Sequence, residues 1–228
     1  MFDRLKLLIS EDDLTYIGTK AILIVGVGGV GGACFEALVR SGFNNITVID
    51  GDCFDNSNLN RQLLSNANNI GNFKASEAYL RALSINPDIS VIEYKMFLSE
   101  ANFDQIKNFT DFDYIIDCCD TVATKLLLIK KALEYKIKII SAMGTGNRLD
   151  PTKVVISNIW QTNYDPLAKV MRKLLRDNKI SYKLPVVTST EIPIKTNQRT
   201  PGSTCFVPNT AGLCLASYVF NDIIKYRK

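Results

Sequence analysis

The chain has 228 residues, 46% of them hydrophobic, with a mean hydropathy of +0.05 and a formal net charge of +4. This length suits one α/β domain, and histidine is absent, which excludes Ser-His-Asp and Cys-His catalysis as well as histidine-ligated zinc. The six cysteines form no C-x-x-C pair, no apolar run is long enough for a membrane span, and the N-terminus is unlike a secretory signal, so we expect a cytoplasmic protein without membrane attachment.

Short apolar runs alternate with helical patterns between residues 21 and 150, which is typical of a mostly parallel sheet with helices on both faces. We therefore predict a Rossmann-like α/β fold. The expected strands are 21–25, 46–50, 90–94, 113–117 and 137–142, and the expected helices are 29–41, 73–85, 100–108 and 122–135.

The pattern changes after Asp150-Pro151. Here we expect a strand over 153–159, a helix from Asp165 to about Asn178, strand and loop over 180–208, and a last helix over about 209–226. No linker separates these parts. We therefore predict a single domain over 1–228, with a nucleotide-binding part (1–160) and a C-terminal, substrate-facing extension (161–228).

A glycine-rich turn directly follows the first predicted strand and opens a predicted helix. Its glycines are Gly26, Gly28, Gly29 and Gly31. Glycines here permit a tight turn and let the backbone approach phosphate at the positive N-terminus of the helix. Asp50 ends the second strand, where a carboxylate can bind a ribose hydroxyl. Up to this point a nicotinamide-dependent dehydrogenase would look the same.

Polar and basic residues in the next segment favour a nucleoside triphosphate. Asn58 and Arg61 lie in a connection expected to run past the phosphates, where Arg offers a planar fork for phosphate oxygens; a solvated polar loop is the alternative. Lys74 opens a predicted helix, where a cation opposes the helix dipole unless an anion accompanies it. A dinucleotide oxidoreductase needs neither Arg61 nor Lys74 at its pyrophosphate.

Two acidic residues, Asp117 and Asp120, follow the fourth predicted strand. The carboxyl ends of parallel strands line the ligand crevice, and two acids there can hold Mg²⁺ beside phosphate oxygens. Asp120 could also cap the following helix, and the two roles are compatible. The neighbouring Cys118 and Cys119 are expected to be buried and structural.

The predicted helix that begins at Asp165 carries a basic stripe. Its members are Lys169, Arg172, Lys173 and Arg176. Because they are spaced at i, i+3, i+4 and i+7, they fall on one helix face and would follow a phosphate backbone such as that of tRNA. A solvated helix face is the alternative.

These motifs together resemble the ubiquitin-activating-enzyme-like family, whose members adenylate carboxylates. The resemblance implies ATP binding by the glycine turn, by an Asp after the second strand, by an N-x-x-R-Q segment, by a Lys at a helix start and by an Asp after the fourth strand. The matching positions are Gly26 to Gly31, Asp50, Asn58, Arg61, Gln62, Lys74 and Asp120. It also implies a homodimer in which Arg4 reaches the phosphates of the neighbouring subunit.

The C-terminal part is similar to one branch of that family, the tRNA threonylcarbamoyladenosine dehydratases. The similar segments are Asp165-Pro166-Leu167-Ala168, Val186 to Glu191, and Pro201-Gly202-Ser203 ahead of the last helix. The similarity implies an enzyme that uses ATP to adenylate the carboxylate of N6-threonylcarbamoyladenosine at position 37 of tRNA. An internal nitrogen would then displace AMP and close a ring.

The alternative within the family is activation of the C-terminal carboxylate of a ubiquitin-like sulfur-carrier protein. Such activators usually carry paired C-x-x-C motifs for zinc, and this sequence has none, so we expect ATP and Mg²⁺ but no zinc. A monovalent cation in the loops 141–147 or 188–210 and a sulfur-transfer protein as partner are left open by the sequence. A nicotinamide-dependent oxidoreductase is the alternative from another class, and Arg61, Lys74 and the two acids disfavour it.

Overall fold

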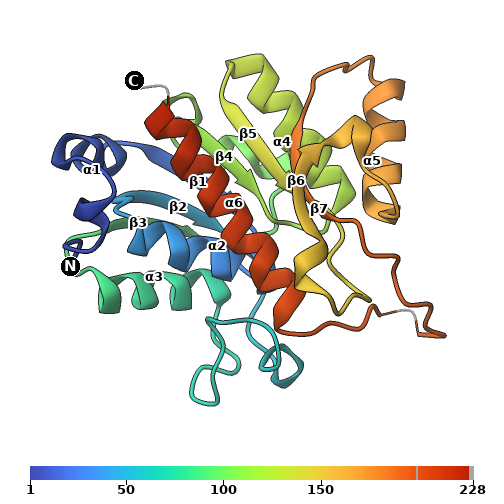
Figure 1. Ribbon diagram of the computed structural model, residues 1–228, viewed down its shortest axis with the longest axis horizontal. Helices are drawn as coiled ribbons and strands as arrows, with labels where there is room; N and C mark the ends of the chain where they lie inside the picture. The colour runs from blue at the N-terminus through green and yellow to red at the C-terminus, as the bar shows by residue number, and fades with distance from the viewer. Residues whose placement is uncertain (199, 226–228) are drawn as a thin grey trace.

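A seven-stranded sheet runs through the centre of the molecule, in a computed structural model that describes residues 1–198 and 200–225 (Figure 1). The strand order is β3-β2-β1-β4-β5-β7-β6, and neighbours are parallel except β6 and β7, which pair antiparallel at one edge. Helices cover both faces of the sheet. The predicted Rossmann-like α/β fold with a mostly parallel sheet is confirmed.

The strands are β1 (Ala21–Val25), β2 (Asn45–Ile49), β3 (Ser90–Tyr94), β4 (Tyr114–Asp117), β5 (Lys138–Ala142), β6 (Val154–Asn158) and β7 (Pro185–Ser189). The α-helices are α1 (Glu11–Gly18), α2 (Gly29–Arg40), α3 (Lys74–Ile85), α4 (Val122–Tyr135), α5 (Pro166–Asp177) and α6 (Phe206–Lys225). Short 3₁₀-helices are Leu5–Leu7, Asn56–Asn58, Glu100–Gln105, Phe109–Asp111, Pro151–Lys153 and Ile159–Gln161.

The central strands bury side chains on both faces. In β1, Ile22 and Ile24 belong to a hydrophobic cluster shared with α2, α3 and α6, while Leu23 and Val25 belong to a second cluster shared with α4 and α5. Successive side chains of a strand point to opposite faces, so a strand covered on both sides must be apolar at every position. This is why β1 appears in the sequence as an unbroken apolar run, whereas the edge strand β3 includes the polar residues Ser90 and Glu93. Each of the five strands predicted between residues 21 and 150 agrees with the structure to within one residue.

Two helices differ from the prediction in kind or position. The helix expected over 100–108 is the 3₁₀-helix Glu100–Gln105, which ends before Asn108, a residue with a left-handed backbone (φ 54°). The last helix begins at Phe206 rather than near 209, because Pro208 lies in its first turn, where a missing N–H leaves no hydrogen bond unmade. Residue 226, its expected end, lies outside the described residues. Among the described residues, none of the helices has the length and apolar character needed to cross a membrane.

Helix α1 has no counterpart among the predicted elements. Ser10 caps it: its hydroxyl accepts a hydrogen bond from Asp13 N (3.0 Å), and the Asp13 carboxylate accepts one from Ser10 N (3.3 Å). This reciprocal box usually carries Glu or Gln at the third helical position, and here carries the shorter Asp. Ile17 anchors the helix in the core. The cap and the acidic first turn were readable signals.

Candidate functional site

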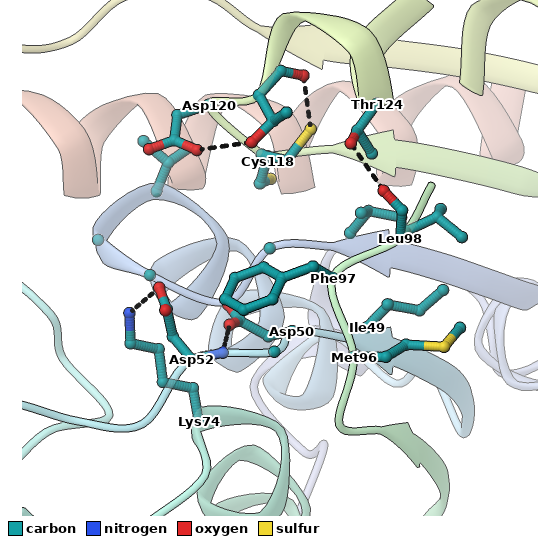
Figure 2. A pocket seen from close by; sticks show the side chains of 18 of the residues that line it. Ile49, Asp50, Asp52, Lys74, Met96, Phe97, Leu98, Cys118, Asp120 and Thr124 are labelled. Carbon is teal, nitrogen blue, oxygen red and sulfur yellow. Dashed lines mark hydrogen bonds and ion pairs between the residues drawn. The ribbon is translucent and has the colours of Figure 1, made fainter. Parts of the chain in front are cut away.

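A cavity of about 620 Å³ lies at the carboxyl ends of β1, β2 and β4. From β1 the chain builds the sheet outward in both directions, through β2 and β3 on one side and β4 and β5 on the other. Such a switch point is where open α/β sheets bind ligands. Figure 2 shows Asp50, Asp52 and Lys74 on one side of this cavity and Asp120 and Cys118 on the other.

The glycine turn between β1 and α2 lines the cavity with backbone. Gly26 has a left-handed backbone (φ 88°), which glycine adopts without strain. At Gly31 an added Cβ would lie 1.8 Å from the carbonyl oxygen of Gly26, so this glycine closes the turn, whereas Gly28 and Gly29 line the cavity itself. Since α2 begins at Gly29, its unpaired first-turn N–H groups are available to an anion there.

Asp50 fastens the glycine turn to the end of β2. Its Oδ2 accepts a hydrogen bond from Val27 N (2.8 Å) and its Oδ1 accepts one from Asp52 N (2.9 Å). Burial raises the pKa of the Asp50 carboxyl, although these backbone hydrogen bonds act in the opposite direction. A carboxylate oxygen can accept more than one hydrogen bond, so Asp50 can hold the turn and bind a ribose hydroxyl as well.

Lys74 is the first residue of α3 and lies buried in the cavity wall. Its Nζ lies 3.0 Å from Oδ2 of Asp52, whose side chain is 55% exposed. The anion that accompanies Lys74 in this structure is therefore a carboxylate of the chain itself, that of Asp52. Sequence reasoning missed Asp52, although its place two residues after Asp50 is a readable, if weak, signal.

The segment after the 3₁₀-helix Asn56–Asn58 contributes Arg61 and Gln62 to the cavity wall. The Arg61 guanidinium donates to the carbonyl oxygen of Ser57 (2.6 Å) and to Oδ1 of Asn60 (3.0 Å), which together restrict the position of the side chain. Gln62 Oε1 is buried and accepts no hydrogen bond from the described residues. Asn58 does not line the cavity; its Oδ1 accepts a hydrogen bond from Asp55 N (3.2 Å) and supports the local turn.

The two acids after β4 lie in opposite surroundings. Asp120 is exposed and lines the cavity. Asp117 is completely buried, and its oxygens lie 3.1 and 3.2 Å from the ammonium of Lys125, which also donates to the carbonyl oxygen of Ala142 (2.7 Å). The structure contradicts the prediction that Asp117 holds a metal, because its carboxylate is neutralised by Lys125 and sealed from the cavity. Within residues 1–198 and 200–225, no three His, Cys, Asp or Glu side chains form a group that could hold a metal ion.

The adjacent cysteines line the cavity as weakly reactive thiols. A hydrogen bond with Cys34, together with burial, raises the pKa of Cys118, and burial followed by the charge of Asp117 raises the pKa of Cys119. A thiol with a raised pKa stays protonated near neutral pH and is a poor nucleophile. Both side chains are only half-buried, at the cavity wall, so the structural role expected of them stays a prediction.

An apolar wall completes the cavity. Its members are Ile49, Met96, Phe97, Leu98 and Leu127. Phe97 is 68% exposed, and Figure 2 shows its ring beside Asp50. A flat apolar surface next to a carboxylate that can accept a hydrogen bond from a ribose hydroxyl suits a nucleobase. Sequence reasoning missed this wall because the connection after β3 carries no spacing signal.

The C-terminal part also reaches the cavity, through Ser203 and Pro208, and the loop after β5 contributes Thr145. The loop after β5 and the segment before α6 are joined to each other, since Asn147 Oδ1 accepts a hydrogen bond from Gly202 N (2.6 Å). Residues from both predicted parts of the chain therefore line one site.

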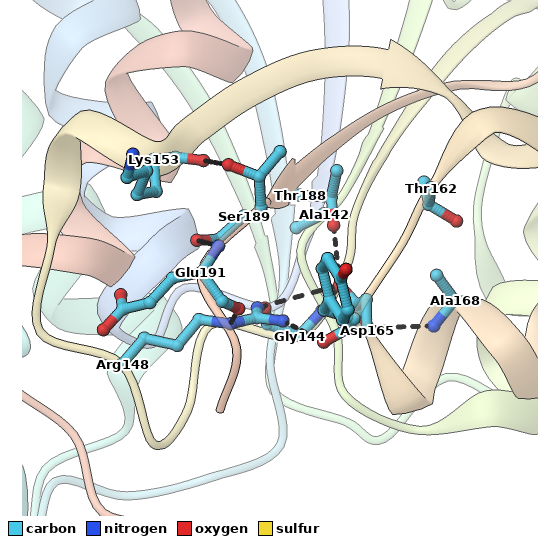
Figure 3. Close-up of polar contacts among 12 residues, drawn as sticks. Ala142, Gly144, Arg148, Lys153, Thr162, Asp165, Ala168, Thr188, Ser189 and Glu191 are labelled. Carbon is cyan, nitrogen blue, oxygen red and sulfur yellow. Dashed lines mark hydrogen bonds and ion pairs between the residues drawn. The ribbon is translucent and has the colours of Figure 1, made fainter. Parts of the chain in front are cut away.

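A buried arginine, Arg148, fixes the loop that carries Thr145 (Figure 3). Its guanidinium donates to the backbone carbonyl oxygens of Gly144, Tyr164 and Glu191, which come from separate segments. Burial lowers the pKa of Arg148, while the nearby Asp165 carboxylate, 3.8 Å away, opposes that change.

Asp165 links this loop to α5. Its Oδ1 caps the helix by accepting from Ala168 N (3.0 Å), and its Oδ2 accepts from Gly144 N (3.0 Å) and from Thr188 Oγ1 (2.8 Å). The start of α5 is therefore tied to a wall of the cavity. Neither Arg148 nor this role of Asp165 follows from motif spacing, because the partners are mostly backbone atoms.

The predicted basic stripe on α5 is only partly free. Lys169, Lys173 and Arg176 are exposed. Arg172 instead folds back on the connection before the helix, where its guanidinium donates to the carbonyl oxygen and the hydroxyl of Thr162. The structure therefore gives Arg172 a structural role and leaves three cations of the stripe facing solvent.

Arg4 lies outside the cavity wall formed by its own chain. It is exposed and directly precedes the 3₁₀-helix Leu5–Leu7. Its predicted role needs a second subunit and stays a prediction.

A Rossmann-like sheet whose cavity gathers a glycine turn, a buried Lys, an Arg and an exposed Asp defines a nucleotide-binding protein with groups suited to a polyphosphate. The family model described as "ThiF family" matches residues 2–209, and the chain belongs to that family.

Named relatives within this family act on tRNA. The tRNA threonylcarbamoyladenosine dehydratase of Bacillus subtilis (strain 168) is 36% identical over 241 residues, covering 98% of this chain and 94% of that protein. The crystal structure of E. coli tRNA N6-threonylcarbamoyladenosine dehydratase in complex with ATP matches with a TM-score of 0.92 at 30% identity, covering 99% of this chain and 94% of that chain. A complex of the same enzyme with AMP matches with a TM-score of 0.91 at 30% identity, covering 97% and 93%. The adenylyltransferase and sulfurtransferase UBA4 of Vanderwaltozyma polyspora is 35% identical, but over 55% of this chain and 28% of that protein.

Proposed function

We propose that this protein is an ATP-dependent tRNA threonylcarbamoyladenosine dehydratase. The carboxylate of the threonylcarbamoyl group on adenosine 37 attacks the α-phosphorus of ATP and pyrophosphate leaves, forming an acyl-adenylate. An internal nitrogen of the same modified nucleoside then attacks the activated carbonyl carbon. AMP leaves, a ring closes, and the nucleoside has lost one water in total.

The observation that carries this proposal is the convergence of Arg61, Lys74, Asp50 and Asp120 on one cavity beside the glycine turn. Two cations and the start of α2 provide positive charge for a triphosphate, and the apolar wall provides a surface for its base. The relatives named as dehydratases match nearly the full length of this chain, and one of them was solved with both ATP and AMP.

The chain's own groups act by placement and charge. Asp50 orients the ribose, Arg61 and Lys74 neutralise the polyphosphate, and Gln62 offers its unsatisfied amide oxygen to the bound nucleotide. The bond that forms at the α-phosphorus comes from the substrate carboxylate, and the bond that breaks releases pyrophosphate, so no protein side chain is covalently involved. Most of the rate enhancement therefore comes from orientation and from stabilising developing charge. Asn58 supports this set through the backbone turn that precedes Arg61.

Mg²⁺ fits this site through Asp120. A single exposed carboxylate beside the phosphate-binding turn is what Mg²⁺ needs when phosphate oxygens and water supply its remaining ligands. When bound, the ion would neutralise charge on the departing pyrophosphate. We do not extend the proposal to a monovalent cation, because three carbonyl groups at the junction of the loops 141–147 and 188–210 already accept hydrogen bonds from Arg148.

A homodimer is part of the proposal, with Arg4 of each subunit reaching the phosphates in its neighbour. The support is the exposed position of Arg4, which leaves its guanidinium outside its own cavity. We also propose that the nucleotide-binding part and the C-terminal extension work as a single domain in the cytoplasm. A sulfur-transfer protein partner is a further proposal, which co-purification can test.

The proposal is tested by measuring AMP formation with three substrates: no RNA, unmodified tRNA, and tRNA that carries threonylcarbamoyladenosine. We expect AMP only with the modified tRNA, together with a loss of about 18 daltons in the nucleoside by mass spectrometry, because AMP carries away one carboxylate oxygen and the attacking nitrogen loses its proton, a net loss of one water. AMP formation that ignores the modified tRNA would contradict the proposal.

Variants of the site test each assigned role. Lys74→Ala and Asp120→Ala should each lower turnover more than about tenfold, and Arg61→Ala should lower it about 10²–10⁴-fold, the range for removing one preorganised charge-stabilising group. Lys130→Ala, an exposed lysine on α4 outside the cavity wall, is the matched control and should keep the wild-type rate. Wild-type turnover in Lys74→Ala or Asp120→Ala would remove that residue from the mechanism.

The alternative substrate, the C-terminus of a sulfur-carrier protein, rests on weaker support. The match to the UBA4 protein covers little more than half of this chain. ATP–pyrophosphate exchange that responds to a carrier ending in Gly-Gly, and not to modified tRNA, would favour it.

A further inference from the structure

A second hollow lies away from the nucleotide cavity, beyond the end of α5. Its volume is about 410 Å³, and it is lined by Trp160, Arg176, Lys179, Ile180 and Ser181. The hollow is shallow and open to solvent, so it suits a flat group stacked against its wall rather than an enclosed ligand. We propose that this hollow binds one unpaired nucleobase of the RNA substrate, with its flanking phosphates on Arg176 and Lys179; the inference rests on the proposed function.

The walls of the hollow are held in place by backbone contacts. Trp160 Nε1 donates to the carbonyl oxygen of Tyr182 (3.0 Å), which fixes the indole ring. After α5 the chain turns back through Lys179, whose backbone is left-handed (φ 56°), and Lys179 N donates to the carbonyl oxygen of Arg176 (2.9 Å). This turn places the two cations side by side next to a rigid aromatic plane.

The charge of the surrounding segment is strongly positive. Its basic residues are Lys169, Arg172, Lys173, Arg176, Lys179 and Lys183, against the acidic Asp165 and Asp177. Asp165 is buried and engaged in capping α5, so Asp177 is the acid that faces solvent with this group. A partner with repeated negative charges is therefore favoured.

An aromatic ring beside two cations matches RNA more closely than an acidic protein. Single-stranded RNA is bound by stacking bases on aromatic side chains while Lys and Arg contact the backbone phosphates. An acidic peptide would use the cations but would leave the indole plane without a partner. The anticodon loop, which contains adenosine 37, supplies unpaired bases of this kind.

Helix α5 connects the two sites. Its first turn is tied to the wall of the nucleotide cavity through Asp165, and its last turn carries Arg176 at the hollow. Twelve residues of α-helix span about 18 Å. The exposed Lys169 and Lys173 lie between them, so an RNA strand whose modified nucleotide enters the cavity has a basic path along α5 toward the hollow. Figure 1 shows α5 at the edge of the molecule, where a large partner can approach it.

The test uses Trp160 as its own reporter, because it is the only tryptophan in the chain. The purified protein is titrated with an unmodified anticodon stem–loop RNA, and separately with ATP and with polyglutamate. We expect quenching of tryptophan fluorescence by the RNA and little change with the other two. An unchanged signal at saturating RNA, or equal quenching by polyglutamate, would overturn the proposal.

Variants give an independent measurement. Trp160→Leu, which keeps an apolar side chain, should weaken RNA binding about tenfold, within the range for losing one base–aromatic stack. The double variant Arg176→Glu/Lys179→Glu should weaken binding at least as much and lower the salt dependence of binding. Both of its positions are exposed, so it tests the proposal even where Trp160→Leu folds poorly. Lys107→Glu, an exposed charge reversal on a distant connection, is the control and should bind RNA as the wild type does.

Activity separates this inference from the proposed function. With modified tRNA, the hollow variants should raise KM about tenfold and leave kcat within about twofold, because they touch only RNA distant from the reacting atoms. Unchanged KM in variants of an enzyme that forms AMP normally would refute the hollow and leave the dehydratase assignment standing. Wild-type protein that binds the stem–loop but forms no AMP would refute the dehydratase assignment instead.

Discussion

Replacing Lys125 by Met should destabilise the protein by about 3–5 kcal/mol, the range for removing one partner of a buried ion pair. Lys125 and Asp117 are both completely buried, with the ammonium 3.1 and 3.2 Å from the carboxylate oxygens. Without Lys125, the donors that the described residues leave to the Asp117 carboxylate are the backbone N–H (3.3 Å) and the thiol (3.0 Å) of Cys119. The assay is equilibrium urea unfolding, with the free energy of unfolding compared at an unchanged slope.

Two further variants make this prediction refutable. Lys130→Met changes an exposed lysine on the same helix and should alter the free energy of unfolding by less than about 0.5 kcal/mol. The double variant Asp117→Asn/Lys125→Met removes both charges and should recover most of the loss, since the cost comes from an uncompensated buried charge. A loss below about 1 kcal/mol in Lys125→Met, or a double variant as unstable as the single one, would show that the ion pair does not stabilise α4 against β4.

Three other predictions concern the cavity and its supports. Gly31→Ala should lower the free energy of unfolding by about 3 kcal/mol or more and abolish ATP binding, because its Cβ would lie 1.8 Å from the Gly26 carbonyl oxygen. At Gly28 the nearest atom to an added Cβ is 3.6 Å away, so Gly28→Ala should fold normally in the same thermal unfolding assay. Arg148→Met should lower the free energy of unfolding by about 3 kcal/mol or more, because it removes the donor to three backbone carbonyl groups and the cation beside the buried Asp165 carboxylate; a melting temperature equal to that of the wild type would contradict this. The ionised Asp50 carboxylate accepts the hydrogen bond that holds the glycine turn, and burial raises its pKa above the ordinary value of 3.8. ATP affinity, measured by calorimetric titration, should therefore be retained above that pKa and fall as the pH drops through it. Asp50→Asn cannot ionise, so its ATP affinity should show no such fall.

The central strands, the glycine turn and the place of Lys74 at a helix start could be predicted because their signals are local. An apolar run followed by closely spaced glycines requires a strand, a tight turn and a helix start, and the structure has all three between Ala21 and Arg40. Lys74 could be placed at the start of α3 on the same grounds. What this local reasoning could not supply was its carboxylate partner, Asp52, because the contact depends on how β2 and α3 meet in space.

The residues that were misjudged or missed depend on long-range packing. Asp117 and Asp120 look equivalent in sequence. In the structure Asp117 is buried in an ion pair with Lys125, whereas Asp120 is exposed, and this difference depends on how α4 packs against the sheet. Arg172 fits a helical stripe by spacing, yet it is drawn to Thr162 by the connection before α5. Arg148 binds backbone carbonyl groups, which carry no sequence signature at all.

The packing of α6 across α2 has a consequence for the order in which the protein can fold. Figure 1 shows the C-terminal helix lying over the helix that follows the glycine turn, and at Gly212 an added Cβ would come within 2.2 Å of the Val30 carbonyl oxygen. The helix that presents its N-terminus to the nucleotide therefore keeps an uncovered apolar face until residues 206–225 have been synthesised. Contacts between segments so far apart in the chain form slowly, and during that interval the exposed face of α2 is a surface for chaperones or for aggregation. Competence to bind ATP should therefore appear late on the ribosome, after the whole of α6 has emerged.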